Sequence, residues 1–127
     1  MIQRMETTKS ILNGLKNNEF KMYLQFIVDN KTKKIVLAEA LSRWESPEKG
    51  IIYPGGYIGQ MEEAGLISMH DYYMFELVCR QLEKWSNTKH KDISISCNFT
   101  RITLSEDDCS NFALSLAPTG FVGGRYT

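Results

Sequence analysis

The feature that most constrains the fold is an alternating segment at residues 34–44, KIVLAEALSRW. Successive side chains of an extended chain point to opposite faces, so this pattern predicts a strand. Glu39, Leu41 and Arg43 then share one face, and the small residues between them share the other. A carboxylate in a half-buried sheet is costly unless a cation or a metal ion accompanies it. Glu39 therefore has two interpretations at this point, a functional carboxylate or an edge-strand charge that discourages aggregation.

The segments around this strand predict an α/β fold. Residues 20–28 alternate in the same way, and the polar segment 29–33 has the length and composition of a hairpin loop. Apolar residues at helical spacing indicate helices on both sides of the hairpin. The expected elements are, in order, a helix from Thr7 or Thr8 to Asn17, the two strands, a helix from about 57 to 65, a helix over 71–85, a strand from 93 to Asn98, and a short helix between 101 and 112 with Ser105 in its N-terminal cap region.

Length and charge restrict the class of protein. A chain of 127 residues is long enough for one domain with a sizeable core and too short for two. Lys+Arg and Asp+Glu both number 15, so no basic excess indicates a duplex nucleic-acid partner. No apolar run approaches the ~18 residues that a membrane helix needs. The first ten residues also lack the apolar region of a secretory signal, so we expect a cytoplasmic protein with no membrane partner.

Cysteine and histidine give no metal-binding pattern. Cys79, Cys97 and Cys109 are odd in number and widely spaced, which predicts reduced structural thiols. His70 and His90 have no spacing typical of metal ligands, and we expect both at the surface or at its boundary.

Six short motifs follow one another along the chain. They are EFKMYLQFIV (19–28), EALSRW (39–44), SPEKG (46–50), PGGYIGQMEEAGLI (54–67), DYYMFELVCRQLEKW (71–85) and CNFT (97–100). In order and spacing they resemble the EAL domain family, bacterial phosphodiesterases that open the ring of cyclic di-GMP. The resemblance runs from about Ser10 to about Phe112. Four residues depart from the family pattern without removing a metal ligand, namely Phe26, Ser42, Met61 and Thr100 in place of proline, leucine, alanine and serine.

The resemblance implies a site. Glu39 and Asn98 match the first two metal ligands of the family, and Mg²⁺ or Mn²⁺ is the implied cofactor, in agreement with the preference of such ions for oxygen ligands. Gln25, Leu41 and Arg43 match contacts to the substrate, cyclic di-GMP. Gln25 has a second interpretation as an inward amide bonded to a neighbouring backbone. Arg43 lies about 13 to 14 Å along the strand from Glu39, too far for an ion pair and suitable for a phosphate of the same extended ligand.

The resemblance also implies a partial fold. A TIM barrel takes roughly 250 residues, so we expect the N-terminal half of a TIM-type β/α barrel with an initial antiparallel β-hairpin. We assign residues 1–112 to this truncated EAL domain and residues 113–127 to an irregular glycine-containing tail unlike the family. The family's later site residues, including a DDFG segment and a catalytic lysine, have no counterpart, so we expect no complete catalytic set in this chain.

The expected function is therefore that of an EAL-type cyclic di-GMP phosphodiesterase domain in bacterial second-messenger signalling, inactive as this chain alone. The alternative is a non-catalytic module that binds cyclic di-GMP or another protein. The open sheet edge and apolar face of an unfinished barrel predict a homo-oligomer.

Overall fold

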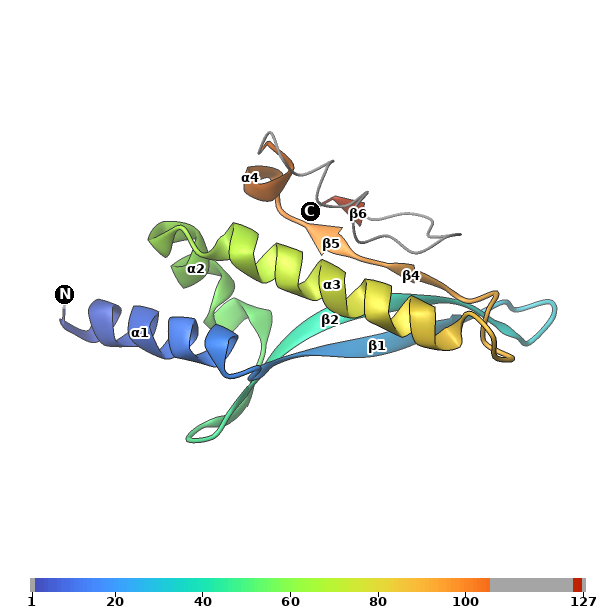
Figure 1. Ribbon diagram of the computed structural model, residues 1–127, viewed down its shortest axis with the longest axis horizontal. Helices are drawn as coiled ribbons and strands as arrows, with labels where there is room; N and C mark the ends of the chain where they lie inside the picture. Colours follow the sequence, from blue (N-terminus) through green and yellow to red (C-terminus); the bar gives the residue numbers. More distant parts are fainter. Residues whose placement is uncertain (1, 106–124, 127) are drawn as a thin grey trace.

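The computed structural model describes residues 2–105 and 125–126, with side chains described from residue 6 to residue 105 (Figure 1). The helices are α1 (Ile2–Lys16), α2 (Ile58–Ala64), α3 (Ile67–Trp85) and α4 (Arg101–Leu104), and a 3-10 turn, η1, spans Pro54–Gly56. The strands are β1 (Phe20–Val28), β2 (Ile35–Ser46), β3 (Gly50–Ile52), β4 (Ser94–Ser96), β5 (Asn98–Phe99) and β6 (Arg125–Tyr126).

The long strand β2 is the centre of the main sheet. β1 pairs with it antiparallel along its whole length, β3 pairs antiparallel with its carboxyl end, and β4 pairs with it in parallel. The two short strands β5 and β6 form a separate parallel pair. The predicted hairpin is thus confirmed, and so is the α/β class of fold.

One face of the sheet is covered by α3, which runs along the strands in Figure 1. Ala38 and Ala40 of β2 are 0% and 5% exposed and belong to the same core cluster as Phe75 and Val78 of α3. Small side chains on this face let the helix backbone approach the sheet closely. The predicted apolar face of the third helix is therefore confirmed.

A second core cluster joins α1 and α2 to the end of the hairpin where β1 begins. The rings of Phe20 and Trp44 stack with centroids 5.1 Å apart, and the ring of Tyr57 meets Phe20 edge-on at 5.0 Å. Gly14 of α1 faces this stack, since a Cβ at this position would lie 3.0 Å from both Phe20 Cε2 and Trp44 Nε1. The glycine therefore permits a close approach between α1 and the hairpin.

The helices differ from the predicted ranges mainly at their starts. α1 begins at Ile2 rather than Thr7, because residues 2–6 contain no proline or glycine that would stop a helix. α2 ends as predicted at Gly65, whose φ of 73° is the left-handed conformation that glycine adopts readily. α3 then starts at Ile67, four residues earlier than predicted.

The strands and the last helix also differ in detail. The segment 50–52, for which no strand was predicted, pairs with β2 as β3, and the predicted strand over 93–98 is divided between β4 and β5. Ser105 is the C-terminal cap of α4, and Thr100 caps the start of α4 by accepting a hydrogen bond from the Thr103 amide. The helix expected after Ser105, up to residue 112, lies outside the described residues, as do Cys109 and most of the glycine-containing tail.

Within the described residues, no helix combines the length and the apolar character needed to cross a bilayer. The prediction of reduced structural cysteines is confirmed for Cys79 and Cys97, which are buried free thiols. Burial raises the pKa of the Cys79 thiol to about 11 and that of the Cys97 thiol to about 12.

Candidate functional site

The face of β2 that points away from α3 carries three of the predicted site residues. Because Ala38 and Ala40 are buried under the helix, the alternating residues Glu39, Leu41 and Arg43 lie on the opposite face. All three are half-buried. The shared face predicted from the alternation is thus confirmed.

Gln25 joins this face from β1. It is the register partner of Glu39 in the antiparallel ladder, and directly opposed residues project to the same side of a sheet. Its side chain is exposed. The interpretation of Gln25 as an inward amide buried against backbone is therefore wrong, because the side chain stands at the open side of the sheet.

Asn98 approaches the same place from the other edge of β2. The parallel pairing of β4 with β2 ends with Ser96 beside Glu39, and β5 starts two residues later at Asn98. Asn98 Nδ2 donates a long hydrogen bond of 3.4 Å to Glu39 Oε2. The two residues predicted as metal ligands are therefore neighbours, brought together from positions 59 residues apart in the chain.

Arg43 is held at the carboxyl end of β2 by two contacts. Its Nη1 donates a 2.7 Å hydrogen bond to the Ser42 carbonyl, and its guanidinium carbon lies 4.6 Å from the centroid of the Tyr53 ring. A cation over an aromatic face is attracted by the ring quadrupole. Tyr53 is itself 65% exposed, so the ring and the guanidinium together present a flat, positively charged surface to solvent. Sequence reasoning gave Tyr53 no role.

A cavity of about 210 Å³ lies beneath this end of the strand. Leu41, Arg43 and Asn98 are among its lining residues, so three of the five predicted site residues border one hollow. The remaining lining residues come from β2, η1, α2, α3 and the segment after β4, namely Ala40, Ser42, Pro54, Ile58, His70, Asp71, Met74, Cys97 and Thr100.

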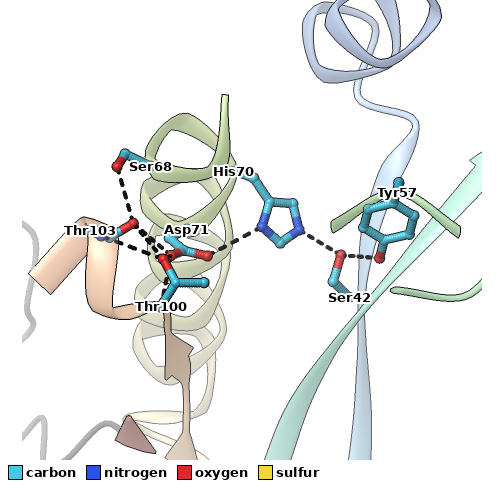
Figure 2. A network of polar contacts seen from close by, with 7 residues as sticks. All are labelled: Ser42, Tyr57, Ser68, His70, Asp71, Thr100 and Thr103. Atoms are coloured by element: carbon cyan, nitrogen blue, oxygen red, sulfur yellow. Dashed lines mark hydrogen bonds and ion pairs between the residues drawn. The ribbon is translucent and has the colours of Figure 1, made fainter. Parts of the chain in front are cut away.

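A chain of polar contacts connects several residues that line this cavity, among them Ser42, His70 and Asp71 (Figure 2). Tyr57 Oη donates to Ser42 Oγ at 2.7 Å, and Ser42 Oγ lies 2.8 Å from His70 Nε2. His70 Nδ1 lies 3.3 Å from Asp71 Oδ1. A carboxylate can only accept, so the contact with Asp71 requires the proton of a neutral His70 ring on Nδ1, and Nε2 then accepts from the Ser42 hydroxyl.

The second carboxylate oxygen of Asp71 binds the segment that follows β5. Asp71 Oδ2 accepts hydrogen bonds from the Thr100 amide at 3.0 Å, the Thr100 hydroxyl at 2.9 Å and the Thr103 hydroxyl at 2.6 Å. Burial by itself raises the pKa of Asp71, but the hydrogen bonds from His70, Thr103 and Thr100 outweigh it, so that the pKa lies below its ordinary value. Asp71 is therefore a buried, ionised carboxylate.

This network was missed at the level of sequence, and one expectation about it is corrected. His70 was expected at the surface or its boundary, but its residue is only 4% exposed, because Ser42 and Asp71 satisfy both ring nitrogens. The one available signal was Ser42, which stands where the family pattern has leucine. A polar residue on the helix-covered face of a strand requires a polar partner from the helix.

The donor atoms near Glu39 suit a hard divalent cation in part. Glu39 supplies a carboxylate oxygen. A half-turn rotation of the Asn98 side-chain amide would present its carbonyl oxygen in place of its nitrogen. Both are ligand types that hard divalent ions prefer. Ser96 Oγ, on the neighbouring strand position, is buried and has no hydrogen-bond partner among the described residues. A water molecule in the coordination shell of a bound ion would give this hydroxyl a hydrogen-bond partner. No group of three or more His, Cys, Asp or Glu able to hold a metal ion occurs in the described part of the chain.

Known proteins with this sequence pattern and fold are EAL domains. A model of the EAL domain family matches residues 8–121, which includes part of the segment after 112 that was expected to differ from the family. The bifunctional diguanylate cyclase/cyclic di-GMP phosphodiesterase MucR of Pseudomonas aeruginosa is 26% identical over 100 residues, which cover 79% of this chain and 15% of MucR.

Solved structures agree on the fold. A MucR phosphodiesterase in complex with cyclic di-GMP has a TM-score of 0.82 at 23% identity and covers 87% of this chain and 45% of that structure. The EAL domain of FimX from Xanthomonas citri, also in complex with cyclic di-GMP, has a TM-score of 0.76 at 16% identity and covers 90% of this chain and 44% of that structure.

The chain thus spans less than half of each of these structures and a small share of MucR. EAL domains are TIM-type barrels, so the predicted fold class, part of such a barrel that begins with an antiparallel hairpin, is confirmed. With the family model matching most of its length, the chain belongs to the EAL domain family.

Proposed function

We propose that this chain carries the cyclic di-GMP-binding strands of an EAL phosphodiesterase site. The observation that carries the proposal is the shared open face of the hairpin, on which Glu39, Leu41 and Arg43 follow one another and Gln25 stands opposite Glu39. MucR, a cyclic di-GMP phosphodiesterase whose structure contains this nucleotide, supports the choice of ligand.

Each residue of this face suits one part of a cyclic dinucleotide. The Arg43 guanidinium binds a phosphate, for which its fixed fork of donors is well suited. Leu41 offers an apolar contact to a base or ribose, and the exposed Gln25 amide offers both a donor and an acceptor to the ligand edge. The separation of about 13 to 14 Å between positions 39 and 43 along the strand suits an extended ligand with two phosphates.

Glu39 and Asn98 are proposed as ligands of Mg²⁺ or Mn²⁺. Their proximity and the orphaned Ser96 hydroxyl support this assignment. Such an ion, when bound, polarises a phosphoryl oxygen and lowers the pKa of an attacking water. Glu39 and Asn98 themselves hold the ion on the strand side, next to the position of Gln25, and Arg43 fixes the far end of the ligand.

We further propose that the 127 residues alone bind the nucleotide without hydrolysing it at an enzymatic rate. Two oxygen donors leave most of a six-coordinate shell to water, which favours weak ion binding. Catalytic groups that act as a unit lose many powers of ten in rate when members are absent. Binding through Gln25, Leu41 and Arg43 depends less on the complete set.

Binding is tested by titrating the chain with fluorescently labelled cyclic di-GMP, with and without Mn²⁺. Arg43→Ala should weaken binding by about tenfold or more, because a hydrogen bond to a charged group contributes about 1.5–3 kcal/mol. Arg80→Ala is the matched control, since Arg80 is an exposed arginine on α3, and it should bind as the wild type does. Equal affinities of the Arg43→Ala and Arg80→Ala variants would refute the assignment.

Hydrolysis is tested by incubating the chain with cyclic di-GMP and Mn²⁺ and separating the linear dinucleotide by chromatography. We expect no product above that of the Glu39→Gln variant. Product formation that Glu39→Gln abolishes, and that the exposed control Glu83→Gln retains, would contradict the proposed inactivity. It would then indicate a site completed by a second copy of the chain.

Two further expectations from the sequence remain predictions, a cytoplasmic location and a homo-oligomeric state. The second is supported by exposed apolar side chains at the far end of the hairpin, where Ile27, Val28, Ile35 and Val36 are 41–48% exposed. Among the described strands, β1 pairs with β2 alone, which leaves it as an open edge.

A further inference from the structure

The buried carboxylate Asp71 connects to both halves of the proposed site, although it belongs to neither set of ligands. Its Oδ2 holds the segment that follows Asn98, through Thr100 and Thr103. Its Oδ1 faces His70, which in turn contacts Ser42, the residue between Leu41 and Arg43. His70 and Asp71, which are adjacent on α3, therefore link β2, which carries the proposed nucleotide contacts, to the segment that follows Asn98 (Figure 2).

Asn98 lies beyond the end of the main sheet, in the short strand β5 that pairs with β6. The ladder between β2 and β4 ends at the pair of Glu39 with Ser96, two residues before Asn98. The chain neighbours of Asn98, Cys97 and Phe99, are buried in the core cluster with α3, and the next hydrogen bonds from this segment to α3 are those of the Thr100 amide and hydroxyl to Asp71. The contact from Asn98 to Glu39 is long, at 3.4 Å, so a small shift of this segment breaks it.

The tie between Asp71 and this segment is strong in both directions. Asp71 is 3% exposed and Thr103 is 0% exposed, so both depend mainly on protein partners for their hydrogen bonds. A buried carboxylate without hydrogen bonds is very costly, and α4 has only four residues, too few to hold its place alone. The carboxylate and the threonines therefore fix each other, and with them the backbone that carries Asn98.

We propose that Asp71 is a positioning residue, which sets the place of the Asn98 amide relative to Glu39 and, through His70 and Ser42, relative to Leu41 and Arg43. The metal-related part of this inference rests on the proposed function, whereas the placement of Asn98 does not. Groups that orient a metal ligand commonly change metal affinity by about 10- to 100-fold when they are removed.

The test uses a matched pair of substitutions at Thr100. Thr100→Val keeps the shape and removes the hydroxyl, which both donates to Asp71 and caps α4, and Thr100→Ser restores both contacts. Asp71→Asn weakens the same contacts from the other side. The first readout is the pair of side-chain amide signals of Asn98 in the ¹⁵N spectrum of the full chain without ligand, assigned by their loss in Asn98→Asp.

We expect Thr100→Val and Asp71→Asn to shift or broaden the Asn98 signals, and Thr100→Ser to leave them as in the wild type. The side-chain amide of Asn30, exposed in the hairpin loop, serves as the internal control and should not change. A purely structural role of the hydroxyl would lower the melting temperature of Thr100→Val while the folded molecules kept wild-type Asn98 signals. That result would overturn the proposal.

The second readout is a titration with Mn²⁺ alone, followed by paramagnetic broadening of the same signals. Thr100→Val should need about tenfold more Mn²⁺ than the wild type for half-broadening, and Thr100→Ser should not. If Mn²⁺ broadens no Asn98 signal in the wild type, the metal assignment fails, and the ligand-free spectra still decide the placement of Asn98 by Asp71. If Thr100→Val and the wild type are half-broadened at equal Mn²⁺, the positioning role is refuted.

Discussion

Replacing Gly14 by alanine should destabilise this chain, although alanine is the better helix former. In an open helical position the change from glycine to alanine stabilises by roughly 1 kcal/mol. At Gly14, however, the new Cβ would lie 3.0 Å from Phe20 Cε2 and Trp44 Nε1 and 3.2 Å from Glu19 Oε1. Phe20 and Trp44 are 0% and 7% exposed and stack on each other, so displacement of either ring disturbs the other.

The magnitude follows from the two opposing effects. Overpacking of a close-packed cluster commonly costs about 1–3 kcal/mol, so after the gain in helix propensity we expect a net loss of about 1 kcal/mol. The clash also threatens the 3.0 Å hydrogen bond from Trp44 Nε1 to Glu19 Oε1, which lies next to the new methyl group.

Gly59 in α2 provides the matched control. It carries the same substitution in a helix, but no atom lies within 4 Å of a Cβ built there. Gly59→Ala should therefore stabilise by about 0.5–1 kcal/mol. Urea unfolding followed by circular dichroism measures both variants in one experiment. If Gly14→Ala were as stable as Gly59→Ala, the close approach between α1 and the Phe20–Trp44 stack would be wrong.

Three further predictions follow from the site and its surroundings. Folding lowers the pKa of Asp71, so its ionised form stabilises the folded chain above pH ~4, and this stability is lost as the pH falls through the folded pKa. Asp71→Asn should therefore flatten the acid side of a stability–pH profile measured by urea unfolding. Ser96→Ala should stabilise the metal-free chain by about 1 kcal/mol, because it removes a buried hydroxyl that has no partner among the described residues, and it should lower the affinity for Mn²⁺. A loss of stability would show that the hydroxyl has a hydrogen-bond partner. Light scattering at micromolar concentration should give a mass above that of a monomer, and Ile27→Lys should reduce it; a monomeric wild type would contradict the expected association.

The strands and their open face could be predicted because they depend on local patterns. Alternation over residues 34–44 fixes which side chains share a face of β2, and the short polar loop predicts the hairpin. The pairing of Gln25 with Glu39 could not be predicted from the loop, because the register shifts between Ile27 and Val28. The approach of Asn98 to Glu39 required one more step, a parallel strand beside β2, which the resemblance to a β/α barrel supplied.

The polar network could not be predicted in the same way. His70 and Asp71 are neighbours in a helix start that contains several other polar residues, and nothing in that pattern says which of them are buried. Their burial becomes apparent only when α3 is laid on the sheet, because Ser42 and Thr100 then reach the two side chains from different strands. Tyr53 escaped notice for the same reason, since its contact with Arg43 depends on how β3 folds back along β2.

The most direct test of the proposed function is to map cyclic di-GMP binding on the chain by ¹⁵N chemical shifts. We expect the largest changes at the backbone amides of Leu41 and Arg43 and at the side-chain amide of Gln25, with little change along the exposed side of α3 around Arg80. The changes should saturate with one affinity, and Arg43→Ala should need at least about tenfold more nucleotide to reach half-saturation. Shifts that are absent, or that centre on α3 or on the far end of the hairpin, would contradict the assignment of the open face of β2 as the nucleotide-binding surface.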